Sequence, residues 1–493
     1  MYNRSSISLN KSLIPIIILI FLLTINGIFG FLPDDTILAN YSFHIILLFC
    51  AFITILIGIN NGVNYKKIFY DIFISVKNIW IAIIILILVG ALSGIWKISG
   101  IIPAMVYYGV DIPTDIFLPL TLVITALVSL TAGSSYITTA TIGIALVAIG
   151  SAFNISTGIT AGAVISGAYF GDKMSPLSDT TNLASAISGT DLYTHIKYMM
   201  YTTFPTFLLT FFIFCIIGIS IESNTGINEV FQKEVILETL NNDFKLSPLL
   251  FLVPLGILIF AILKIKPIIT LMFGVLFALV VALFYQSCNM DEALLSIFYG
   301  PSIELVFPIK SIITEPGQYP IINFGLEELY IGFNDLYGSG GILSMKWVIT
   351  LTICAMVFGG CMGAIGALKQ ITNYLLSKTK TIFDLFRSTF ISCIGVNITA
   401  SDQYLSIILP GKMFKNAYKE KGLAPQNLSR TLEDTGTVTS ALIPWNSCGA
   451  YHSGVLGVST VDYMLYCFFN WISPLMTLVY AYFIIKIKSI IKS

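Results

Sequence analysis

The chain has 493 residues, of which 56% are hydrophobic and only 11% are charged. Soluble globular domains carry about 25% charged residues, so this composition excludes most water-soluble enzymes and disordered proteins. The 26 basic and 26 acidic residues balance, which argues against a nucleic-acid partner because the chain has no global basic field.

Charge-poor stretches long enough to cross a bilayer recur along the chain. The first, residues 13–32, follows Arg4 and Lys11. It is too long for a signal-peptide core and no small-residue cleavage site follows, so we expect a spanning helix. The further candidate spans are residues 37–59, 78–96, 196–221, 247–263, 267–287, 347–367 and 463–485. These spans predict an all-α integral membrane protein.

Two further apolar regions, residues 116–170 and 388–458, are interrupted by glycine and proline. These residues break helices and release backbone polar groups, which inside a membrane must be met by protein or water. Broken helices of this kind are typical of transport sites. We expect residues 116–152 and 381–410 to form re-entrant hairpins, each followed by a broken helix.

The basic residues predict the orientation of the chain, because Lys and Arg concentrate in cytoplasmic loops. With the N-terminus inside, 21 of the 26 basic residues fall in inner segments, among them Lys173 and Arg430. We therefore expect a multi-pass protein of a bacterial-type plasma (inner) membrane, with both termini cytoplasmic and membrane lipid as its surroundings.

The order of elements repeats at an offset of about 262 residues along the chain. Residues 78–96 then fall on 340–358, and residues 116–152 on 378–414. The two copies begin on opposite sides of the membrane, so we predict inverted-topology repeats; a chance match of hydropathy is the alternative. The predicted division is a first repeat over 1–221, an extracellular linker over 222–246, and a second repeat over 247–493 with an extracellular loop at 288–346.

Polar residues gather where the first broken helix is expected, between residues 171 and 182. Hard cations such as sodium take oxygen ligands, which carboxylates, hydroxyls and amides supply. The alternative is an ordinary cytoplasmic loop with a helix cap. The candidate ion ligands of this segment are Asp172, Ser178, Asp179, Thr180, Thr181 and Asn182.

The second half places its polar residues in two pieces. Acids inside a membrane mark ion paths or proton relays. Asp402 is expected at a hairpin tip, whereas for Glu433 a helix N-cap is an equally good explanation. The candidates of this half are Thr399, Asp402, Glu433, Asp434, Thr435 and Asn446. As sodium ligands proper we single out Asp172, Asp179, Asn182 and Asp402.

The first hairpin tip carries hydroxyls but no acid. Ser134 and Thr138 are therefore candidate ligands, with a bond back to the helix backbone as the alternative role. His452 lies beyond the second broken segment, where a proton relay is the alternative to a packed core histidine.

Motifs for catalysis are missing from the sequence. It contains no Walker lysine motif, HExxH or GxSxG, so neither ATP-driven transport nor hydrolysis has support. The eight cysteines lie mostly in apolar runs and contain no CxxC pair. We therefore expect a transporter and not an enzyme, with no cofactor; sodium ions and protons are the transported or coupling species.

Three strings resemble the NhaC family of sodium/proton antiporters. They are residues 131–146 (TAGSSYITTATIGIAL), 171–185 (GDKMSPLSDTTNLAS) and 401–451, which begins SDQYLSIILPGKM and ends TLEDTGTVTSALIPWNSCGAY. The resemblance covers nearly the whole chain and implies paired hairpins in inverted repeats, with exchange of cytoplasmic sodium for external protons. Some relatives exchange malate for lactate or move amino acids. The chain departs from the family pattern at Ser401 and His452.

Three functions follow from these patterns. The first is a sodium/proton antiporter working by alternating access, in which Asp172, Asp179 and Asp402 bind either ion. The second is an exchanger of a small organic anion or an amino acid that uses the same ions as its gradient. The third is a passive channel or a structural membrane subunit. A homodimer is among the assemblies that the sequence allows.

Overall fold

A computed structural model describes residues 7–29, 41–222, 237–238, 240–301 and 340–490. In this part of the chain nearly all regular structure is helical, and the one β-contact is an isolated bridge between Leu423 and Ser489. The elements up to residue 222 are α1 (Leu9–Phe29), α3 (Ser42–Asn60), α4 (Tyr65–Asn78), α5 (Trp80–Ile98), α6 (Ile101–Gly109), α7 (Thr114–Ala132), α8 (Ser135–Thr138), the π-helix η1 (Thr139–Gly143), α9 (Ile144–Ala152), α10 (Thr157–Met174), α11 (Asp179–Ser188) and α12 (Leu192–Glu222).

The second half follows a similar order of long and interrupted helices. Its elements are the 3₁₀-helix η2 (Pro248–Phe251), α14 (Leu252–Ile262), α15 (Pro267–Val280), the π-helix η3 (Val281–Tyr285), α16 (Met290–Tyr299), the 3₁₀-helix η4 (Ile342–Met345), α20 (Lys346–Ala364), α21 (Ala367–Ser377), α22 (Ile382–Ala400), α23 (Gln403–Glu420), α24 (Pro425–Leu432), the π-helix η5 (Glu433–Thr437), the 3₁₀-helix η6 (Val438–Leu442), α25 (Ser447–Leu456), α26 (Thr460–Met464) and α27 (Phe468–Tyr482).

Among the described residues, nine helical stretches are long and apolar enough to span a bilayer. The chain is therefore an all-α multi-pass membrane protein, as its composition predicts. The helix expected at 196–221 is α12, and the one expected at 78–96 is the second part of a longer stretch, Tyr65–Ile98. Most of the predicted loop 288–346 and linker 222–246 lies outside the described residues.

The helix predicted over 463–485 is wrong as a single span. The chain breaks between α26 and α27, and the Trp471 indole donates to the Met464 carbonyl at 2.6 Å across the break. Helix α10 packs directly on this turn, where a Cβ added to Gly162 would lie 2.5 Å from the Tyr466 Cβ. The residues at the break are apolar and include no glycine or proline. A prediction from hydropathy alone therefore extends one helix across residues 465–467.

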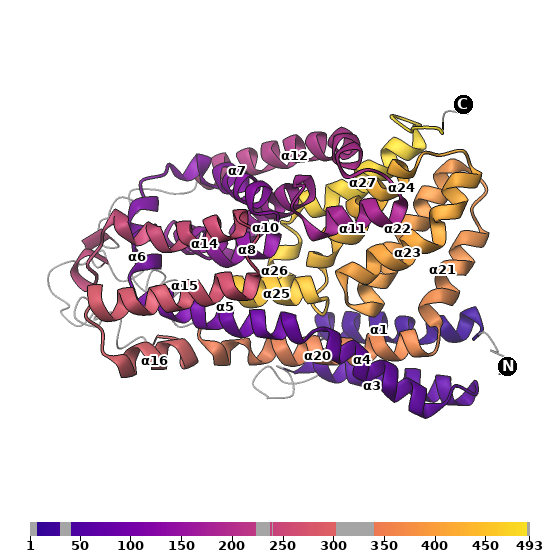
Figure 1. Ribbon diagram of the computed structural model, residues 1–493, viewed down its shortest axis with the longest axis horizontal. Coiled ribbons are helices and arrows are strands. Elements are labelled where there is room, and N and C mark those ends of the chain that lie inside the picture. Colours follow the sequence, from indigo (N-terminus) through magenta and orange to yellow (C-terminus); the bar gives the residue numbers. More distant parts are fainter. Residues whose placement is uncertain (1–6, 30–40, 223–236, 239, 302–339, 491–493) are drawn as a thin grey trace.

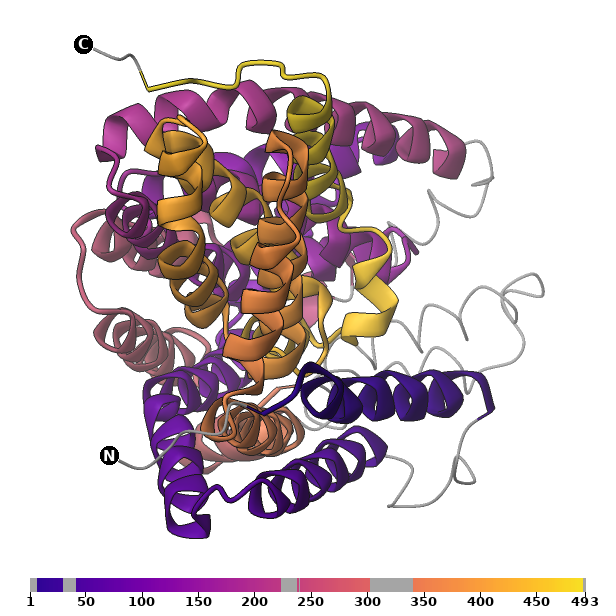
Figure 2. The same ribbon diagram turned by 90° about the vertical axis from the view of Figure 1, so that its right-hand side faces the viewer.

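The molecule is elongated, with α6 and α16 near one end and both chain termini, α21 and α24 toward the other (Figure 1). The short and broken helices α8, α10, α25 and α26 lie in its middle. Seen from the end that carries the termini, α22 and α23 lie between α12 on one side and α1 on the other (Figure 2). The largest apolar core contains residues of every helix from α5 through α10, and also of α25. It fixes the broken helices in the interior.

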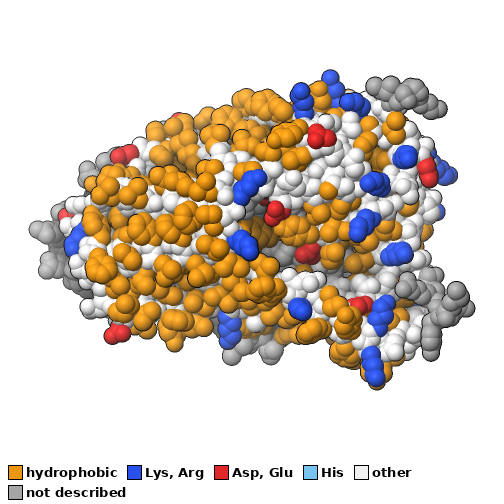
Figure 3. Space-filling view, viewed as in Figure 1, with side chains coloured by type: hydrophobic (Ala, Val, Ile, Leu, Met, Phe, Trp, Pro, Cys, Tyr) orange, Lys and Arg blue, Asp and Glu red, His pale blue; other side chains and the backbone are white. Residues whose placement is uncertain are grey.

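Side chains divide along the same axis. On the face shown in Figure 3, hydrophobic side chains cover the end that carries α6 and much of the middle, while Lys and Arg gather mainly toward the end with the termini. An apolar belt next to a basic end is what a bilayer and its cytoplasmic interface favour.

Two helical hairpins turn in the interior with nearly the same backbone. Helix α7 ends at Gly133 with φ of 68°, and Ser134 then caps α8 by accepting from the Ile137 amide. Helix α22 ends at Ser401 with φ of 57°, and Asp402 caps α23. The left-handed conformation favours glycine, and at Gly133 an added Cβ would also lie 2.5 Å from Leu177 Cβ.

Candidate functional site

The candidate site lies where two interrupted helices meet. Helix α10 ends at Met174, and the chain runs through Ser175 and Pro176 before α11 starts at Asp179. Opposite it, α24 passes into the π-helix η5 at Glu433 and then into the 3₁₀-helix η6. Widened π-turns often occur at functional sites, and this one begins with two fully buried acids, Glu433 and Asp434.

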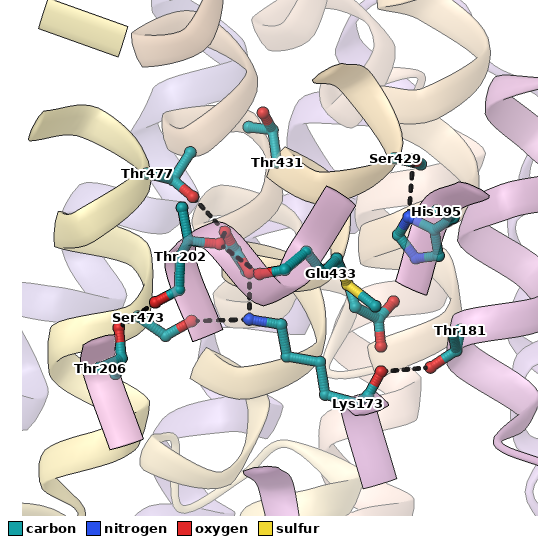
Figure 4. A network of polar contacts seen from close by, with 12 residues as sticks. Lys173, Thr181, His195, Thr202, Thr206, Ser429, Thr431, Glu433, Ser473 and Thr477 are labelled. Atoms are coloured by element: carbon teal, nitrogen blue, oxygen red, sulfur yellow. Dashed lines mark hydrogen bonds and ion pairs between the residues drawn. The ribbon is translucent and has the colours of Figure 1, made fainter. Parts of the chain in front are cut away.

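Asp434 belongs to a closed group of polar side chains, which we call the closed cluster. It forms an ion pair with Lys173, and both side chains are completely buried. Its other carboxylate oxygen accepts from the Thr202 hydroxyl at 2.8 Å and from the Thr477 hydroxyl. The Lys173 ammonium also donates to Ser473 Oγ at 3.0 Å (Figure 4). Charge and hydrogen-bonding capacity are therefore matched within this cluster.

Glu433 points the other way and is only half satisfied. One oxygen, Oε1, accepts from the Thr180 hydroxyl at 2.8 Å. The second oxygen, Oε2, is buried and has no hydrogen-bond partner among the described residues. A buried charge without partners is costly, so this oxygen is ready to take a proton or a cation.

Asp172 is the third buried acid, with 6% of its surface exposed. Its Oδ2 accepts from the amide of Ser135 at 3.0 Å and from the hydroxyl of the same residue at 2.7 Å. The Ser178 hydroxyl interacts electrostatically with this carboxylate and lies 3.1 Å from Thr180 Oγ1. Hydroxyl groups therefore connect Asp172 to Glu433.

These side chains form what we call the open cluster: Asp172, Glu433, Ser135, Ser178 and Thr180. Within the described residues the ion pairs are Lys173–Asp434 and the surface pair Arg387–Asp384, so neither acid of the open cluster has a cationic partner within 4 Å. Two buried carboxylates bridged by hydroxyls offer oxygen ligands to a hard cation, and the same oxygens bind protons.

Three of the four predicted sodium ligands lie outside this buried group. Asp179 and Asn182 are exposed, and the Asn182 amide donates to the carbonyls of Pro176 at 3.0 Å and Ser178 at 2.7 Å. Asp402 is half-buried at its hairpin tip and accepts from the Leu405 amide at 2.7 Å. Asn182 and Asp402 thus support local turns and caps, and Asp179 lies at the exposed start of α11.

Several predicted hydroxyl ligands bond to nearby backbone. Thr138 donates to the Ser134 carbonyl at 2.9 Å and Thr399 to the Gly395 carbonyl at 2.5 Å. Thr181 donates to the Lys173 carbonyl at 3.0 Å, which ties α11 to the end of α10. The exception is Thr435, whose buried hydroxyl has no hydrogen-bond partner among the described residues.

Asn446 holds the second hairpin in place. Its amide donates to the Asn397 carbonyl at 3.1 Å, and its oxygen accepts from the Cys448 amide at 3.1 Å. Asn397 in turn donates to the Gly436 carbonyl of η5 at 2.7 Å. Asn446 therefore contacts the π-helix that carries the acids only indirectly, through Asn397.

The placement of two basic residues on the cytoplasmic surface is wrong. Lys173 is completely buried in the closed cluster, and the guanidinium of Arg430, also buried, lies over the Tyr198 ring at 4.6 Å. Both residues flank intramembrane acids in the sequence, which is a signal that a count of loop charges ignores.

Threonines of α12 and α27 were missed by the sequence reasoning. Thr202, Thr206 and Thr210 are spaced by four residues on an otherwise apolar helix and are all buried. This spacing puts three hydroxyls on one helix face and could have indicated a polar contact in the interior. For Thr477 and Ser473 the same spacing of four applies.

Comparisons with known proteins agree with this arrangement. The sequence profile of the "Na+/H+ antiporter family" matches residues 167–485, which include the closed cluster and, apart from Ser135, the open cluster. The chain is 37% identical over 442 residues to the "Na(+)/H(+) antiporter NhaC" of Alkalihalophilus pseudofirmus, covering 89% of this chain and 90% of that protein.

Two further relatives match over most of their length. An "Uncharacterized Na(+)/H(+) antiporter" of Haemophilus influenzae is 34% identical, over 81% of this chain and 82% of that protein. The "Malate-2H(+)/Na(+)-lactate antiporter" of Bacillus subtilis is 32% identical, over 91% and 90%. With matches of this extent, the chain belongs to the Na+/H+ antiporter family.

Proposed function

We propose that this chain is a sodium/proton antiporter that exports cytoplasmic sodium in exchange for external protons. The observation that carries the proposal is the open cluster, in which Asp172 and Glu433 are buried and form no ion pair with any described residue. Its members are joined through hydroxyls, so two acids act as one binding site for a small cation.

Exchange follows from competition at these oxygens. Sodium binds to charged carboxylates and hydroxyl oxygens, whereas a proton neutralises a carboxylate that is held in a low-dielectric interior. Glu433 Oε2 and the Thr435 hydroxyl have no hydrogen-bond partner in the described part of the chain and supply further oxygens. One site that holds either sodium or protons, opened alternately to the two sides, couples the two fluxes without ATP.

The closed cluster positions this site. Lys173 follows Asp172, and Asp434 follows Glu433, so the ion pair fixes the backbone of both acids of the open cluster. Because Asp434 is neutralised by Lys173 and two threonines, it is not free to exchange ions. Its contribution is to hold α10 against η5.

The orientation and the inverted repeat are part of the proposal. The end that carries both termini would face the cytoplasm of a bacterial-type plasma membrane, which the basic side chains near that end support (Figure 3). The two hairpin tips support a repeat of the halves 1–221 and 247–493, since Gly133–Ser134 and Ser401–Asp402 have matching conformations.

A flux assay tests the function. The purified chain is reconstituted into proteoliposomes, and a pH dye reports internal pH after a sodium gradient is imposed, with lithium and potassium in parallel. We expect a pH change that requires sodium and the protein. Sodium movement with no linked proton movement would instead indicate a channel and overturn the proposal.

An exchanger of organic acids is the second candidate. Besides the malate/lactate relative, a cavity of about 360 Å³ supports it, because Lys97, Ser93 and Ser453 line its wall. A buried ammonium beside hydroxyls suits a carboxylate ligand. Uptake of labelled malate, lactate or an amino acid driven by the sodium gradient would favour this function over simple ion exchange.

A further inference from the structure

The threonine hydroxyls along the helical run from α24 to η6 are used in two different ways. Thr431 of α24 donates to the Asn427 carbonyl at 2.8 Å, and Thr439 of η6 donates to the Thr435 carbonyl at 2.6 Å. Both bonds return to the carbonyl four residues earlier, as threonine hydroxyls often do in helices. In η5, by contrast, the hydroxyls of Thr435 and Thr437 are completely buried and have no hydrogen-bond partner among the described residues. The exceptions therefore fall in the π-turn.

The winding of η5 explains this difference. A π-turn bonds each amide to the carbonyl five residues earlier, which displaces the carbonyl four residues back from its α-helical position. A hydroxyl in this turn is therefore not consumed by its own helix. Thr437 lies four residues after Glu433, and residues four apart share a helix face, whereas Thr435 is only two residues away. The Thr437 hydroxyl interacts electrostatically with the Glu433 carboxylate.

The second hairpin grips the π-turn with both of its arms. From α22, the Asn397 amide donates to the Gly436 carbonyl at 2.7 Å and to Thr439 Oγ1 at 3.0 Å. From α23, the single hydroxyl proton of Ser406 is shared between the Gln403 carbonyl at 2.7 Å and the Gly436 carbonyl at 3.1 Å. A Cβ added to Gly436 would lie 2.9 Å from Ser406 Oγ, so glycine permits this close approach. Asn397 is the stronger of the two donors.

The Asn397 side chain has only one suitable orientation in this contact. The Gly436 carbonyl can only accept, so the amide nitrogen must face it. The Thr439 proton is used at the Thr435 carbonyl, which leaves its oxygen to accept the second amide proton. The Asn397 oxygen in turn accepts from the Asn446 amide at 3.2 Å. Asn397 thus spans the change from the π-turn to the 3₁₀-helix η6 with all its polar atoms bonded.

We propose that Thr437 is a direct sodium ligand of the open cluster, and that Asn397 is the positioning residue that keeps the Thr437 hydroxyl free by holding the π-turn. Thr437 adds a ligand to the site of the proposed function, on which its role rests.

The chemistry of a hydroxyl gives this ligand a specific effect. Glu433 Oε2 and Thr437 Oγ1 are buried oxygens on one face of η5, without a hydrogen-bond partner in the part of the chain that the structure describes. Hard cations bind carboxylates together with neutral oxygens. A hydroxyl coordinates sodium but, unlike a carboxylate, takes up no proton near neutral pH. Thr437 therefore raises the affinity for sodium and leaves proton binding to the acids.

Sodium affinity measured at several pH values tests the ligand. The sodium-dependent rise of the unfolding temperature in detergent reports this affinity without any flux, with potassium keeping the ionic strength constant. Thr437→Val should weaken sodium binding roughly tenfold or more, as expected for a lost bond to a charged group. The pH below which protons displace sodium should stay unchanged, because Glu433 is intact. Thr437→Ser keeps the hydroxyl and should bind sodium normally, and so should Thr431→Val, whose hydroxyl bonds its own helix.

Two results would overturn the ligand. One is an unchanged sodium affinity in Thr437→Val. The other is an equal shift of sodium affinity and of the pH of proton displacement, which would show a distorted cluster instead of a lost oxygen. The proposed function fails separately, since it requires sodium-linked proton flux by the original chain in proteoliposomes.

A double variant tests the positioning role. Asn397→Ala should weaken sodium binding as Thr437→Val does, because the released turn lets the Thr437 hydroxyl bond back to its own helix. Adding Thr437→Val to Asn397→Ala should then change little, since the hydroxyl is already lost. If Asn397→Ala does not fold, Ser406→Ala replaces it in the same comparison, with a smaller first loss. Independent, additive losses in the double variant would show that Asn397 does not act through Thr437.

Discussion

The open and the closed cluster are built from neighbouring residues of the same two helices, yet they differ in how far their charges are matched. Asp434 contacts a lysine and two threonines, whereas Glu433, the residue before it, contacts one threonine and has one oxygen without a partner among the residues that the structure describes. Likewise Lys173 is paired, whereas Asp172, the residue before it, accepts hydrogen bonds from Ser135 and has no ion pair among the described residues. A matched charge stabilises the fold, whereas an unmatched one is available for an ion.

The largest effect is expected at Glu433. Glu433→Gln keeps the Thr180 contact but removes the charge, so sodium loses its ligand and the proton its acceptor. We expect sodium-linked proton flux to fall at least about 100-fold, with little loss of stability, because a buried charge is removed together with its cost. Flux in proteoliposomes and thermal unfolding in detergent measure the two quantities.

Glu420→Gln is the matched control, because it makes the same change at an exposed site at the end of α23. It should leave both flux and unfolding unchanged. Asp172→Asn should resemble Glu433→Gln. Normal flux in both Asp172→Asn and Glu433→Gln would show that ions do not exchange at the open cluster.

Much of this contrast could be predicted from the sequence, but the pairing could not. The scarcity of charge singles out Asp172, Glu433 and Asp434, because an acid in an apolar chain needs a reason. Nothing in the sequence shows that Lys173 reaches Asp434, since the two are far apart along the chain. The same polar segment also contains Asp179, and only the turn at Pro176 decides that it is exposed.

The helices, too, could be predicted from the sequence only in part. Apolar length predicts α1, α3 and α12 well, because spanning a bilayer fixes how many residues are needed. Hydropathy misses the break between α26 and α27, where tight packing of Gly162 on Tyr466 replaces the usual glycine or proline signal.

The closed cluster should respond in stability where the open cluster responds in transport. Lys173→Met leaves the charge of Asp434 buried and unpaired, which typically costs about 3–5 kcal/mol. The double variant Lys173→Met with Asp434→Leu removes both charges and should recover much of that loss. Unfolding of the single and double variants in detergent measures this. If Lys173→Met were as stable as the original chain, Asp434 would not need its partner and the contrast between the clusters would fail.

A smaller effect is expected at Ser135, which joins the first hairpin tip to the open cluster. Ser135→Ala removes the hydroxyl bond to Asp172 but keeps the amide bond. A hydrogen bond to a charged group contributes about 1.5–3 kcal/mol, so the apparent affinity for sodium should fall roughly tenfold or more. Ser151→Ala on α9, whose hydroxyl bonds only the Val147 carbonyl, serves as the control. Equal sodium affinities in the two variants would remove Ser135 from the site.

The smallest effect is expected at Asp402, and it separates a ligand from a helix cap. Asp402 occupies the tip position that Ser134 occupies in the first hairpin, and both side chains cap the helix that follows. Asparagine caps helices as well as aspartate does, so Asp402→Asn removes only the charge. Because no hydrogen bond within the described residues joins this half-buried carboxylate to the open cluster, we expect the apparent affinity for sodium to fall about threefold, from weaker electrostatic attraction of the ion. Asp402→Ala should in addition lower stability by about 1 kcal/mol through loss of the cap. A loss of flux in Asp402→Asn as complete as in Glu433→Gln would make this carboxylate a direct ligand and would extend the open cluster to the second hairpin tip.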